Sequence, residues 1–517
     1  MIASLLLVVA VIPLLYFLQR WNTLRKSPLN KFPGPWHAKW SNFSHSRRFL
    51  SGRQPYKMIK LHEKYVRYAP NEVSFSTSAA WRDIYGPRGK DHGKFVKSEF
   101  YDGGKFASAA PSIITERDPD KHAVWRKQLS TAFSDRAMRD DVEHVVAGVV
   151  DTLIAEVDKR ARVASDTVGG GAAINIDPFF NMVTFDIMGH MSLGVDFGCV
   201  AKGRLHEWGV FLASTLRLMS VVDALKKFPT LGRIGVWVFS KHINAMLADR
   251  DKHEQYSQDL VKENPSSGRP LTGVLNTRRR LANGRAGASD FISHAVAVQR
   301  QAKMPVSELH LAAIASDLVI AGTETSATGL SATLYYLLSN RHVVAKLRAE
   351  LLAACPAYED LTHANLARLK YLDAVIMEGL RMYPPLPVAL HRLVPPAGDT
   401  VHGLWLPGGT VVSVNPLAAN YSPANFSDPW AYKPERWTDP NCTDDLDACR
   451  PFSLGTRNCI GQNLAWMEMR ITLAKLLYMF DLELANPDLD WHGESRMHSL
   501  WENPPLWVRV ARRENNK

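Results

Sequence analysis

The sequence predicts a mainly α-helical fold with small β-sheets, formed by one large domain behind an N-terminal membrane anchor. Long stretches carry apolar residues at helical spacing, and two shorter stretches alternate as half-buried strands do. No internal repeat or heptad array divides the 517 residues, so we expect residues 53–517 to be a single domain. The helical stretches are 135–163, 181–193, 305–338 and 342–354, and the strand-like stretches are 66–75 and 401–416.

The first residues predict the anchor. Residues 2–18 carry no charge and are mostly Leu, Val and Ile, a run at the short end of what spans a bilayer. Positive residues follow it and stay on the cytosolic side, so we expect residues 1–19 to be a single-pass anchor with the rest of the chain in the cytosol. A cleaved signal peptide is the alternative, but it would need a positive start and an A-x-A-like site, and neither is present.

Residues 20–52 predict a Pro-rich hinge between anchor and domain. Pro33 and Pro35 bracket Gly34, which makes the chain stiff and non-helical there.

Composition narrows the class of protein. Hydrophobic residues make up 46% and charged residues 22%, so a large core is feasible and wholesale disorder is excluded. Five Cys are too few for a disulfide framework and fit a reducing, cytosol-facing location. The net charge of +11 suits contact with anionic lipid or an acidic partner. Nucleic-acid binding is disfavoured because no dense basic run or nucleic-acid motif appears.

The most informative segment is the loop 452–461, which reads F-x-x-G-x-R-x-C-x-G with no position missing. Cys459 precedes a predicted helix at 462–477, whose free N–H groups and positive end favour a thiolate. Gly455 and Gly461 allow sharp turns and the close approach of a flat partner. Arg457 supplies a cation for a carboxylate, and Phe452 can shield the sulfur from water. A shielded thiolate beside an anion-pairing cation suggests haem iron with a Cys axial ligand.

Zinc is the rival metal, but Cys442, Cys449 and Cys459 lack CxxC spacing and no His pair flanks them. The loop 452–461 resembles the haem-binding loop of the cytochrome P-450 superfamily. This resemblance covers residues 30–517 and implies the fold of that family, with haem b bound through the Cys459 thiolate as metal ligand. It also implies that NADPH acts only through a partner reductase.

Two other motifs extend the resemblance in the right order. Glu378 and Arg381 form an E-x-x-R motif and share one helix face, so they can pair. Residues 434–437, Pro-Glu-Arg-Trp, resemble the P-E-R-F motif of the family with Trp in place of Phe. The resemblance implies that Glu378, Arg381 and Arg436 form a buried structural network behind the haem.

Residues 321–326, Ala-Gly-Thr-Glu-Thr-Ser, resemble the A-G-x-E-T-T motif of the family. Gly322 beside a Glu-Thr pair is unfavourable inside an apolar helix, which points to a functional reason. The alternatives are a hydrogen bond from Thr325 to a helical carbonyl and a plain packing contact at Gly322. The resemblance implies that the helix opens beside the haem, where Glu324 and Thr325 relay protons to bound dioxygen. Ser326 replaces the second Thr and keeps a hydroxyl.

Haem carries two propionates, which need cations. The resemblance assigns this role to Arg457, to Arg392 after the Pro384-Pro385 turn, and to His122 and Arg126, four residues apart on one predicted helix. For His122 the alternative is an ordinary surface histidine.

The resemblance also implies partners. An acidic NADPH-cytochrome reductase would be steered by cations near the thiolate, although solvated charge is the alternative for each of them. The candidates are Lys121, Lys127, Arg136 and Arg450. A lipophilic small molecule would occupy a pocket that mostly apolar stretches line. These stretches are 101–114, 211–224, 316–320, 386–390 and 497–501.

Together these features predict a monooxygenase of the endoplasmic reticulum membrane that inserts one oxygen atom from dioxygen into a lipophilic small molecule. Residues 69–75 resemble those of fungal microsomal members that tailor secondary metabolites. Two alternatives are a haem-thiolate isomerase or dehydratase that does not activate dioxygen, against which the Glu324-Thr325 pair argues, and a non-catalytic haem-bearing ligand binder. Two departures from the family pattern are a short lead at 65–68 and extra sequence at 260–276.

Overall fold

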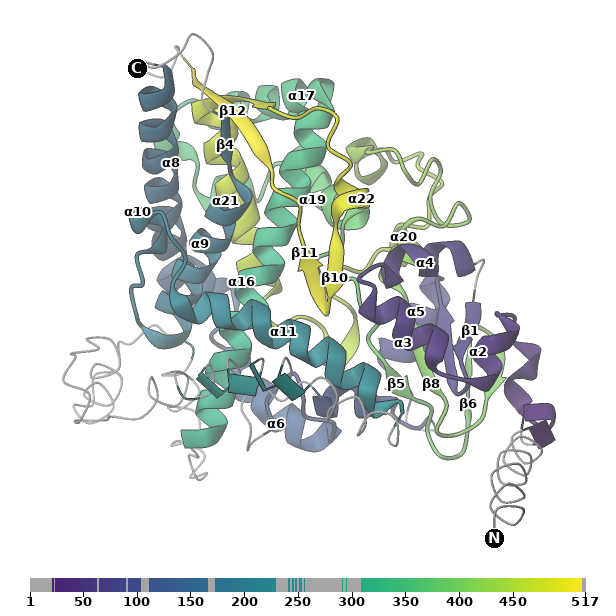
Figure 1. Ribbon diagram of the computed structural model, residues 1–517. Helices are drawn as coiled ribbons and strands as arrows, with labels where there is room; N and C mark the ends of the chain where they lie inside the picture. Colours follow the sequence, from purple (N-terminus) through teal and green to yellow (C-terminus); the bar gives the residue numbers. More distant parts are fainter. Residues whose placement is uncertain are drawn as a thin grey trace.

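The computed structural model describes residues 21–22, 24–62, 65–89, 92–103, 111–165, 173–228 and 308–513, together with scattered positions between 240 and 294. Helices gather on one side of the molecule, and a small sheet with the N-terminal helices forms the other side (Figure 1). The prediction of a mainly α fold with small β-sheets is confirmed.

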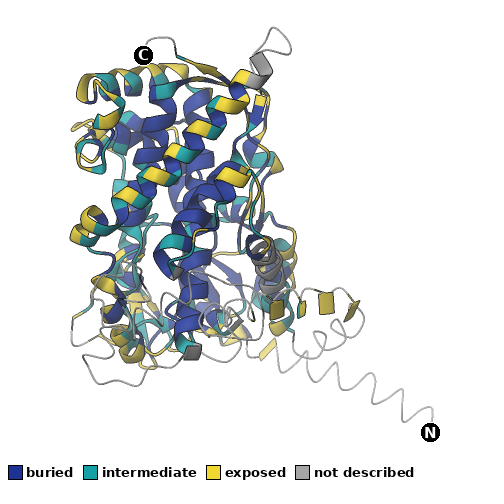
Figure 2. Cartoon of the chain, turned by 90° about the vertical axis from the view of Figure 1, so that its left-hand side faces the viewer, coloured by how far each residue is buried: buried dark blue, intermediate teal, exposed yellow. Residues whose placement is uncertain are grey.

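The core is built around α16 (Glu308–Ser339). All of residues 311–320 are buried, as expected of a helix that is apolar on every face. α16 packs against α9 (Asp177–Met188), α19 (Lys370–Met382) and α21 (Gln462–Met479). Figure 2 shows central helices that are buried nearly all round and peripheral helices with an exposed outer face.

The four predicted long helices are present, with shifted ends. The stretch 135–163 is α7 (Asp135–Ala137), a π-helical turn (Met138–Val142) and α8 (Glu143–Ser165). α9 begins at Asp177 instead of 181, because Pro178 suits the first turn of a helix, and a second π-helical turn (Gly189–Leu193) follows it. The other two stretches are α16 and α17 (Arg341–Ala354).

The largest sheet has five strands in the order β1-β2-β8-β5-β3. β1 (Tyr65–Ala69) and β2 (Glu72–Phe75) form an antiparallel hairpin, so the prediction of one strand over 66–75 was wrong. Pro70 has no N–H for a strand ladder, which is why the chain turns there. β8 (Val411–Val414) runs parallel to β2, and β5 (Arg392–Leu393) joins β8 to β3 (Val96–Lys97).

Three smaller sheets pair β12 with β4 and β9, β10 with β11, and β6 with β7 among the described residues. Their strands are β4 (Ala173–Asn175), β6 (Asp399–Val401), β7 (Leu404–Leu406), β9 (Phe480–Leu484), β10 (Arg496–His498), β11 (Leu500–Glu502) and β12 (Trp507–Arg512). The other helices are α4 (Gln54–Leu61), α5 (Ser78–Tyr85), α6 (Pro119–Ser130), α10 (Cys199–Lys202), α11 (Glu207–Lys226), α18 (His363–Leu366), α20 (Pro416–Asn420) and α22 (Trp491–Glu494).

The segment 20–52 carries local structure in its described part. A 3-10 turn (Pro28–Lys31) leads into α2 (Trp36–Trp40) and α3 (Phe43–Leu50), and the side chains of Phe32 and Phe49 are buried. Across the described part of the chain, none of the helices combines the length and apolar character that crossing a bilayer requires. The predicted anchor at 1–19 and the extra segment at 260–276 lie outside the described residues.

Two glycines let other helices approach α16 closely. A Cβ on Gly379 of α19 would lie 2.9 Å from Cβ and 3.1 Å from Cα of Thr333, so a side chain there would collide with the backbone of α16. A Cβ on Gly322 of α16 would lie 2.7 Å from Cγ of Met188 on α9. The packing reason for Gly322 is therefore confirmed.

We expect Gly379→Ala to destabilise the protein by about 1–3 kcal/mol, because the added methyl forces α19 away from Thr333. Gly148→Ala is the matched control, since Gly148 lies exposed within α8 and a Cβ there meets nothing within 4 Å. That change should be neutral or stabilise by up to about 1 kcal/mol. Urea unfolding of both variants measures the difference, and equal midpoints would contradict the close-approach explanation.

Candidate active site

Cys459 is held by a closed loop directly before α21. The loop contains the 3-10 turn Gly455–Arg457, and Gly461 is the N-cap residue of α21. The backbone N–H of Cys459 donates to the carbonyl oxygen of Phe452 at 2.9 Å. Gly455 has φ +71°, and a Cβ there would overlap the Tyr85 carbonyl oxygen, so this turn requires glycine. The loop therefore fixes the thiol at the N-terminal end of the helix.

The thiol of Cys459 lies in an unusual environment. Its side chain is exposed, yet burial among protein atoms raises the pKa of the thiol above its ordinary value. The Gly461 N–H and the Arg126 guanidinium act in the opposite direction, as predicted for a helix N-terminus, but burial outweighs them.

The prediction that the helix end favours the thiolate is therefore confirmed in direction, while burial of the thiol without a metal acts against it. A coordinated metal deprotonates a thiol outright, so the site suits a metal ligand better than an unassisted nucleophile. Among the described residues, no three or more His, Cys, Asp and Glu side chains gather as a metal cluster.

A flat partner fits beside Cys459. Gly461 has φ −85° and ψ 14°, which any residue adopts, and a Cβ there would meet only the Phe133 ring, at 3.8 Å. Neither the backbone nor the protein packing therefore requires glycine, whereas a planar group against this point would. The Phe452 ring lies beside the loop with its centroid 6.2 Å from that of Trp466.

Four cations surround the site and none forms an ion pair with a carboxylate of the described residues. Their nitrogens donate to neutral oxygens instead: Arg457 to the carbonyl of Glu116 at 2.6 Å, Arg392 to the carbonyl of His391 at 3.0 Å, Arg126 to the carbonyl of Asn458 at 2.7 Å, and Lys97 to the carbonyl of Ile114 at 2.5 Å. Burial, and then the charge of Arg392, lower the pKa of Arg457 to about 10.

The pKa of His122 is sensitive to these four positive charges. His122 is buried on α6, and burial together with Arg457, Lys97, Arg126 and Arg392 lowers the pKa of its imidazole to about 3. The alternative of a surface histidine is therefore excluded. A cluster of buried and half-buried cations that has no carboxylate ion pair among the described residues suits a group with two carboxylates, as haem has.

Sequence reasoning missed Lys97. Its pKa is lowered well below the ordinary value by burial and by Arg457 and Arg392. Lys97 pairs with Arg392 in the β3–β5 register, and only this sheet brings the two side chains together. The sequence signal was faint, a lone Lys in the segment Phe95-Val96-Lys97.

Glu378, Arg381 and Arg436 do form a buried cluster. Arg381 donates to both oxygens of Glu378, at 2.8 and 2.9 Å, and Arg436 Nε donates to Glu378 Oε1 at 3.0 Å. The indole N–H of Trp437 donates to Glu378 Oε2 at 2.9 Å, so the departure from P-E-R-F adds a hydrogen bond. Asp444, which sequence reasoning missed, pairs with Arg436.

Glu324 and Thr325 lie midway along α16, which is helical without interruption. The Thr325 hydroxyl donates to the Ala321 carbonyl oxygen at 2.5 Å, so the hydrogen bond considered as an alternative is confirmed. Burial, and then the charge of Asp177, raise the pKa of Glu324 to about 7. The carboxyl can therefore gain or lose a proton near neutral pH.

A second carboxyl, Glu468 of α21, faces α16 and was missed by sequence reasoning. It is buried and neither oxygen has a hydrogen-bond partner. Burial raises its pKa to about 8, against a small opposing effect of Ser326. Glu468 is therefore mostly a neutral acid at pH 7.

The four candidate reductase contacts are divided by their surroundings. Lys121 and Lys127 are exposed on α6, the helix that carries Arg126, whereas Arg136 pairs with Asp140 and Arg450 pairs with Asp447.

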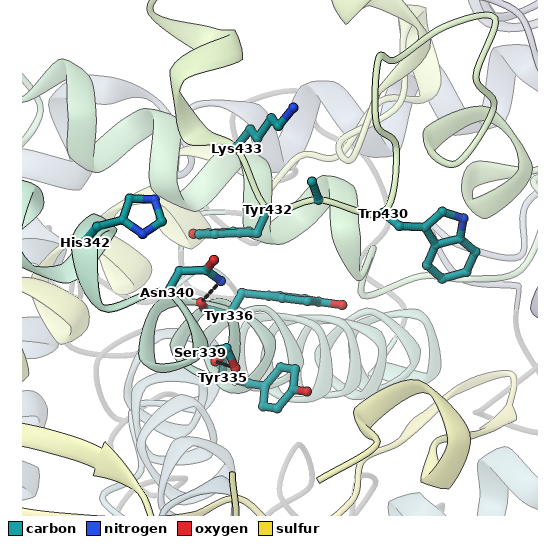
Figure 3. A pocket seen from close by; sticks show the side chains of 9 residues that line it. Tyr335, Tyr336, Ser339, Asn340, His342, Trp430, Tyr432 and Lys433 are labelled. Carbon is teal, nitrogen blue, oxygen red and sulfur yellow. Dashed lines mark hydrogen bonds between the residues drawn. The ribbon is translucent and has the colours of Figure 1, made fainter. Parts of the chain in front are cut away.

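A surface cleft of about 460 Å³ lies away from the Cys459 loop, at the end of α16, and none of its lining residues is a predicted site residue (Figure 3).

A cysteine at a helix N-terminus, a glycine that leaves room for a flat group, and a cluster of cations with no ion pair among the described residues define a haem-thiolate type of site. The cytochrome P-450 family model matches residues 34–507. The chain therefore belongs to the cytochrome P-450 family and is a haem-thiolate monooxygenase.

Relatives and solved structures agree. The chain is 41% identical over 471 residues to cytochrome P-450 monooxygenase ORF11 of Penicillium roqueforti, covering 90% of this chain and 91% of that protein. It is 39% identical over 493 residues to cytochrome P-450 monooxygenase BipB of Cochliobolus sativus, covering 93% and 92%. The crystal structure of the cytochrome P-450DA haem domain shares the fold, with a TM-score of 0.72 at 19% identity over 93% of this chain and 98% of that one.

The neutral state of Glu468 predicts a pH dependence of stability. A carboxyl whose folded pKa is raised, here from 4.5 to about 8, contributes fully below pH 4.5, and this contribution is lost as pH rises toward 8. Each pH unit of separation contributes about 1.4 kcal/mol. Glu468→Gln keeps a neutral side chain, so we expect its thermal midpoint to fall less than that of the wild type between pH 5 and pH 8.

The exposed Glu359 provides the control, and Glu359→Gln should follow the wild-type curve. Parallel curves for wild type and Glu468→Gln would show that Glu468 is ionised in the folded protein.

Proposed function

We propose that this chain is a membrane-anchored monooxygenase that oxidises a lipophilic small molecule in secondary metabolism, with the iron of haem b bound by Cys459. The observation that carries the assignment of the site is the proximity of four cations, which form no ion pair among the described residues, to His122 and to the Cys459 loop. Arg457, Arg392, Arg126 and His122 are assigned to the propionates, with Lys97 added to this set. Gly461 and Phe452 are assigned to the face and the shield of the haem.

When bound, the haem supplies the dioxygen chemistry, and the chain supplies binding, orientation and protons. Glu324 is assigned to hold the proton, because a pKa of about 7 lets it donate and recover one at neutral pH. Thr325 is assigned to pass it on, with its hydroxyl oriented by the Ala321 carbonyl. Glu378, Arg381 and Arg436 keep the chain behind the loop in place.

The anchor at 1–19 and a location in the endoplasmic reticulum membrane, with the domain in the cytosol, remain part of this proposal. The described residues next to the anchor support it: Trp21, Trp36 and Phe43 are half or more exposed, although such large apolar side chains are usually buried. We assign Lys121 and Lys127 as docking contacts for an acidic NADPH-cytochrome reductase, since they are exposed on the helix that reaches the Cys459 loop.

The ligand assignment predicts a spectrum. Reduced protein treated with carbon monoxide should show the red-shifted Soret band of a thiolate-ligated haem, and Cys459→Ser should abolish it. Cys449→Ser is the control, since Cys449 is buried in a separate apolar cluster and should be dispensable for the band. Persistence of the band in Cys459→Ser would overturn the assignment.

The addition of Lys97 predicts a loss of haem affinity. Lys97→Met keeps the apolar stem and removes the charge, which should weaken haem binding by about 1–3 kcal/mol, the usual range for a hydrogen bond to a charged group. Haem retained after gel filtration, read from the ratio of Soret to protein absorbance, measures the loss. Lys94→Met, at an exposed lysine three positions away, should retain haem like the wild type. Full retention by Lys97→Met would remove Lys97 from the set.

A further inference from the structure

His492 on α22 is surrounded by the hydroxyls of three tyrosines. Its Nε2 lies 2.6 Å from the Tyr336 hydroxyl and 3.1 Å from that of Tyr421, and its Nδ1 lies 3.1 Å from that of Tyr56. Burial lowers the pKa of His492 to about 4, so the imidazole is neutral at pH 7 and one ring nitrogen has no hydrogen.

The hydrogen bonds identify that nitrogen. Tyr421 donates its single hydroxyl proton to the Met382 carbonyl oxygen at 2.5 Å, so it offers only lone pairs to His492. Tyr336 has its acceptor when Nε2 carries no hydrogen, and Nδ1–H then donates to Tyr56. The 2.6 Å contact with Tyr336 is the shortest of the three, and we assign it to Tyr336 O–H donating to bare Nε2. A phenol that can pass its proton to a neutral imidazole is easier to oxidise by one electron, because the positive charge leaves with the proton.

A series of aromatic rings in contact connects Tyr336 and His492 to Trp501, which lies near the candidate active site. Trp501 stacks on Tyr383, with centroids 4.4 Å apart, and Tyr383 lies 6.0 Å from the His492 ring. A parallel branch runs from Tyr383 through Trp491 at 5.6 Å and then Tyr335 at 5.0 Å to Tyr336 at 5.2 Å. These contacts form one continuous path, which we call the aromatic network.

The inner end of the aromatic network, Trp501, lies close to α16, the helix that carries Glu324 and Thr325. The Trp501 indole N–H donates to the Pro384 carbonyl oxygen at 2.8 Å. The next residue, Pro385, has its Cγ 3.6 Å from where a Cβ on Gly329 would lie, and Gly329 is one helical turn beyond Thr325 on α16. Trp501 also belongs to the stretch 497–501 that we predict to line the substrate pocket.

The outer end reaches solvent. Trp430 is 55% exposed and lies 4.2 Å from Tyr421 and 5.7 Å from His492, measured between ring centroids. Tyr336 stacks on Tyr432 at 5.4 Å, and both line the cleft of about 460 Å³ with Trp430 (Figure 3). The cleft has room for a small molecule from solution.

We propose that Tyr336 and His492 form a proton-coupled redox pair within the aromatic network, which carries oxidising equivalents from the haem pocket to the surface cleft. The inference rests on the haem function proposed above. With haem bound, one electron from Tyr336 would pass inward through Trp501 and would reduce the oxidised haem site by one equivalent. The Tyr336 hydroxyl proton moves to His492 Nε2. A one-electron reductant at the cleft, such as ascorbate or a thiol, restores the electron, and the proton returns to the phenol.

The test uses the full chain loaded with haem and treated with an organic hydroperoxide in the absence of substrate. Freeze-quenched samples should show a tyrosyl radical by electron paramagnetic resonance, and Tyr336→Phe should lose most of that signal. Tyr432→Phe is the matched control, because its ring lines the same cleft but its hydroxyl donates to the Val375 carbonyl oxygen instead of an imidazole. An unchanged signal in Tyr336→Phe, or no protein radical in the wild type, would overturn the proposal.

A second measurement uses the wild-type protein, so it does not depend on the folding of a variant. Trp430 and Trp405 are similarly exposed, at 55% and 50%, but only Trp430 contacts His492 and Tyr421. Peptide mass spectrometry after peroxide treatment should find oxygen added to Trp430 well above Trp405, and added ascorbate should suppress the difference. Equal oxidation would contradict the proposal. The carbon monoxide spectrum separates the haem assignment from the proposed aromatic network. If the wild type lacked the red-shifted Soret band, the haem assignment would be wrong, whereas a normal band without a tyrosyl radical would contradict the aromatic network alone.

Discussion

One buried carboxylate, Glu378, holds together the part of the chain that supports the site. Five donors converge on it: two nitrogens of Arg381, Nε of Arg436, the Trp437 indole and the backbone N–H of Lys433. A buried charge is tolerable only when its hydrogen bonds are complete, and removing one partner of such a pair typically costs about 3–5 kcal/mol. The chain between α19 and the Cys459 loop therefore has one stable arrangement.

Two opposite electrostatic effects act in the site: repulsion among neighbouring cations and the cost of burying negative charge. The cations around His122 repel one another and lack carboxylate ion pairs among the described residues, which favours an anionic group beside them. On α16 and α21, Glu324 and Glu468 have the reverse problem, because burial disfavours their charged forms and keeps protons on them near neutral pH. The cations and the protonated carboxyls thus lie on different elements of the fold.

Much of the fold followed from the sequence because its helices are long and strongly periodic. The outcomes differ where local pattern and tertiary packing disagree: Pro70 breaks the predicted strand into a hairpin, and π-helical turns after Ala137 and Met188 shift the helix register. Lys97, Glu468 and Asp444 were missed because each lies outside every motif of the sequence. Their significance comes from neighbours distant along the chain, such as Arg392 across the β3–β5 register.

The sequence by itself determined the kind of protein, because a fixed spacing of Phe, Gly, Arg and Cys before a helix reflects local chemistry. The tertiary structure decided the protonation of these groups, since burial depends on how the whole chain packs. The N-terminal end of α21 lowers the pKa of the Cys459 thiol, as the sequence predicts, whereas burial, which only the packed chain produces, raises it, and a bound metal favours the thiolate again. Packing of the whole chain also brings three tyrosines from distant parts of the sequence around His492. No local sequence pattern predicts this cluster.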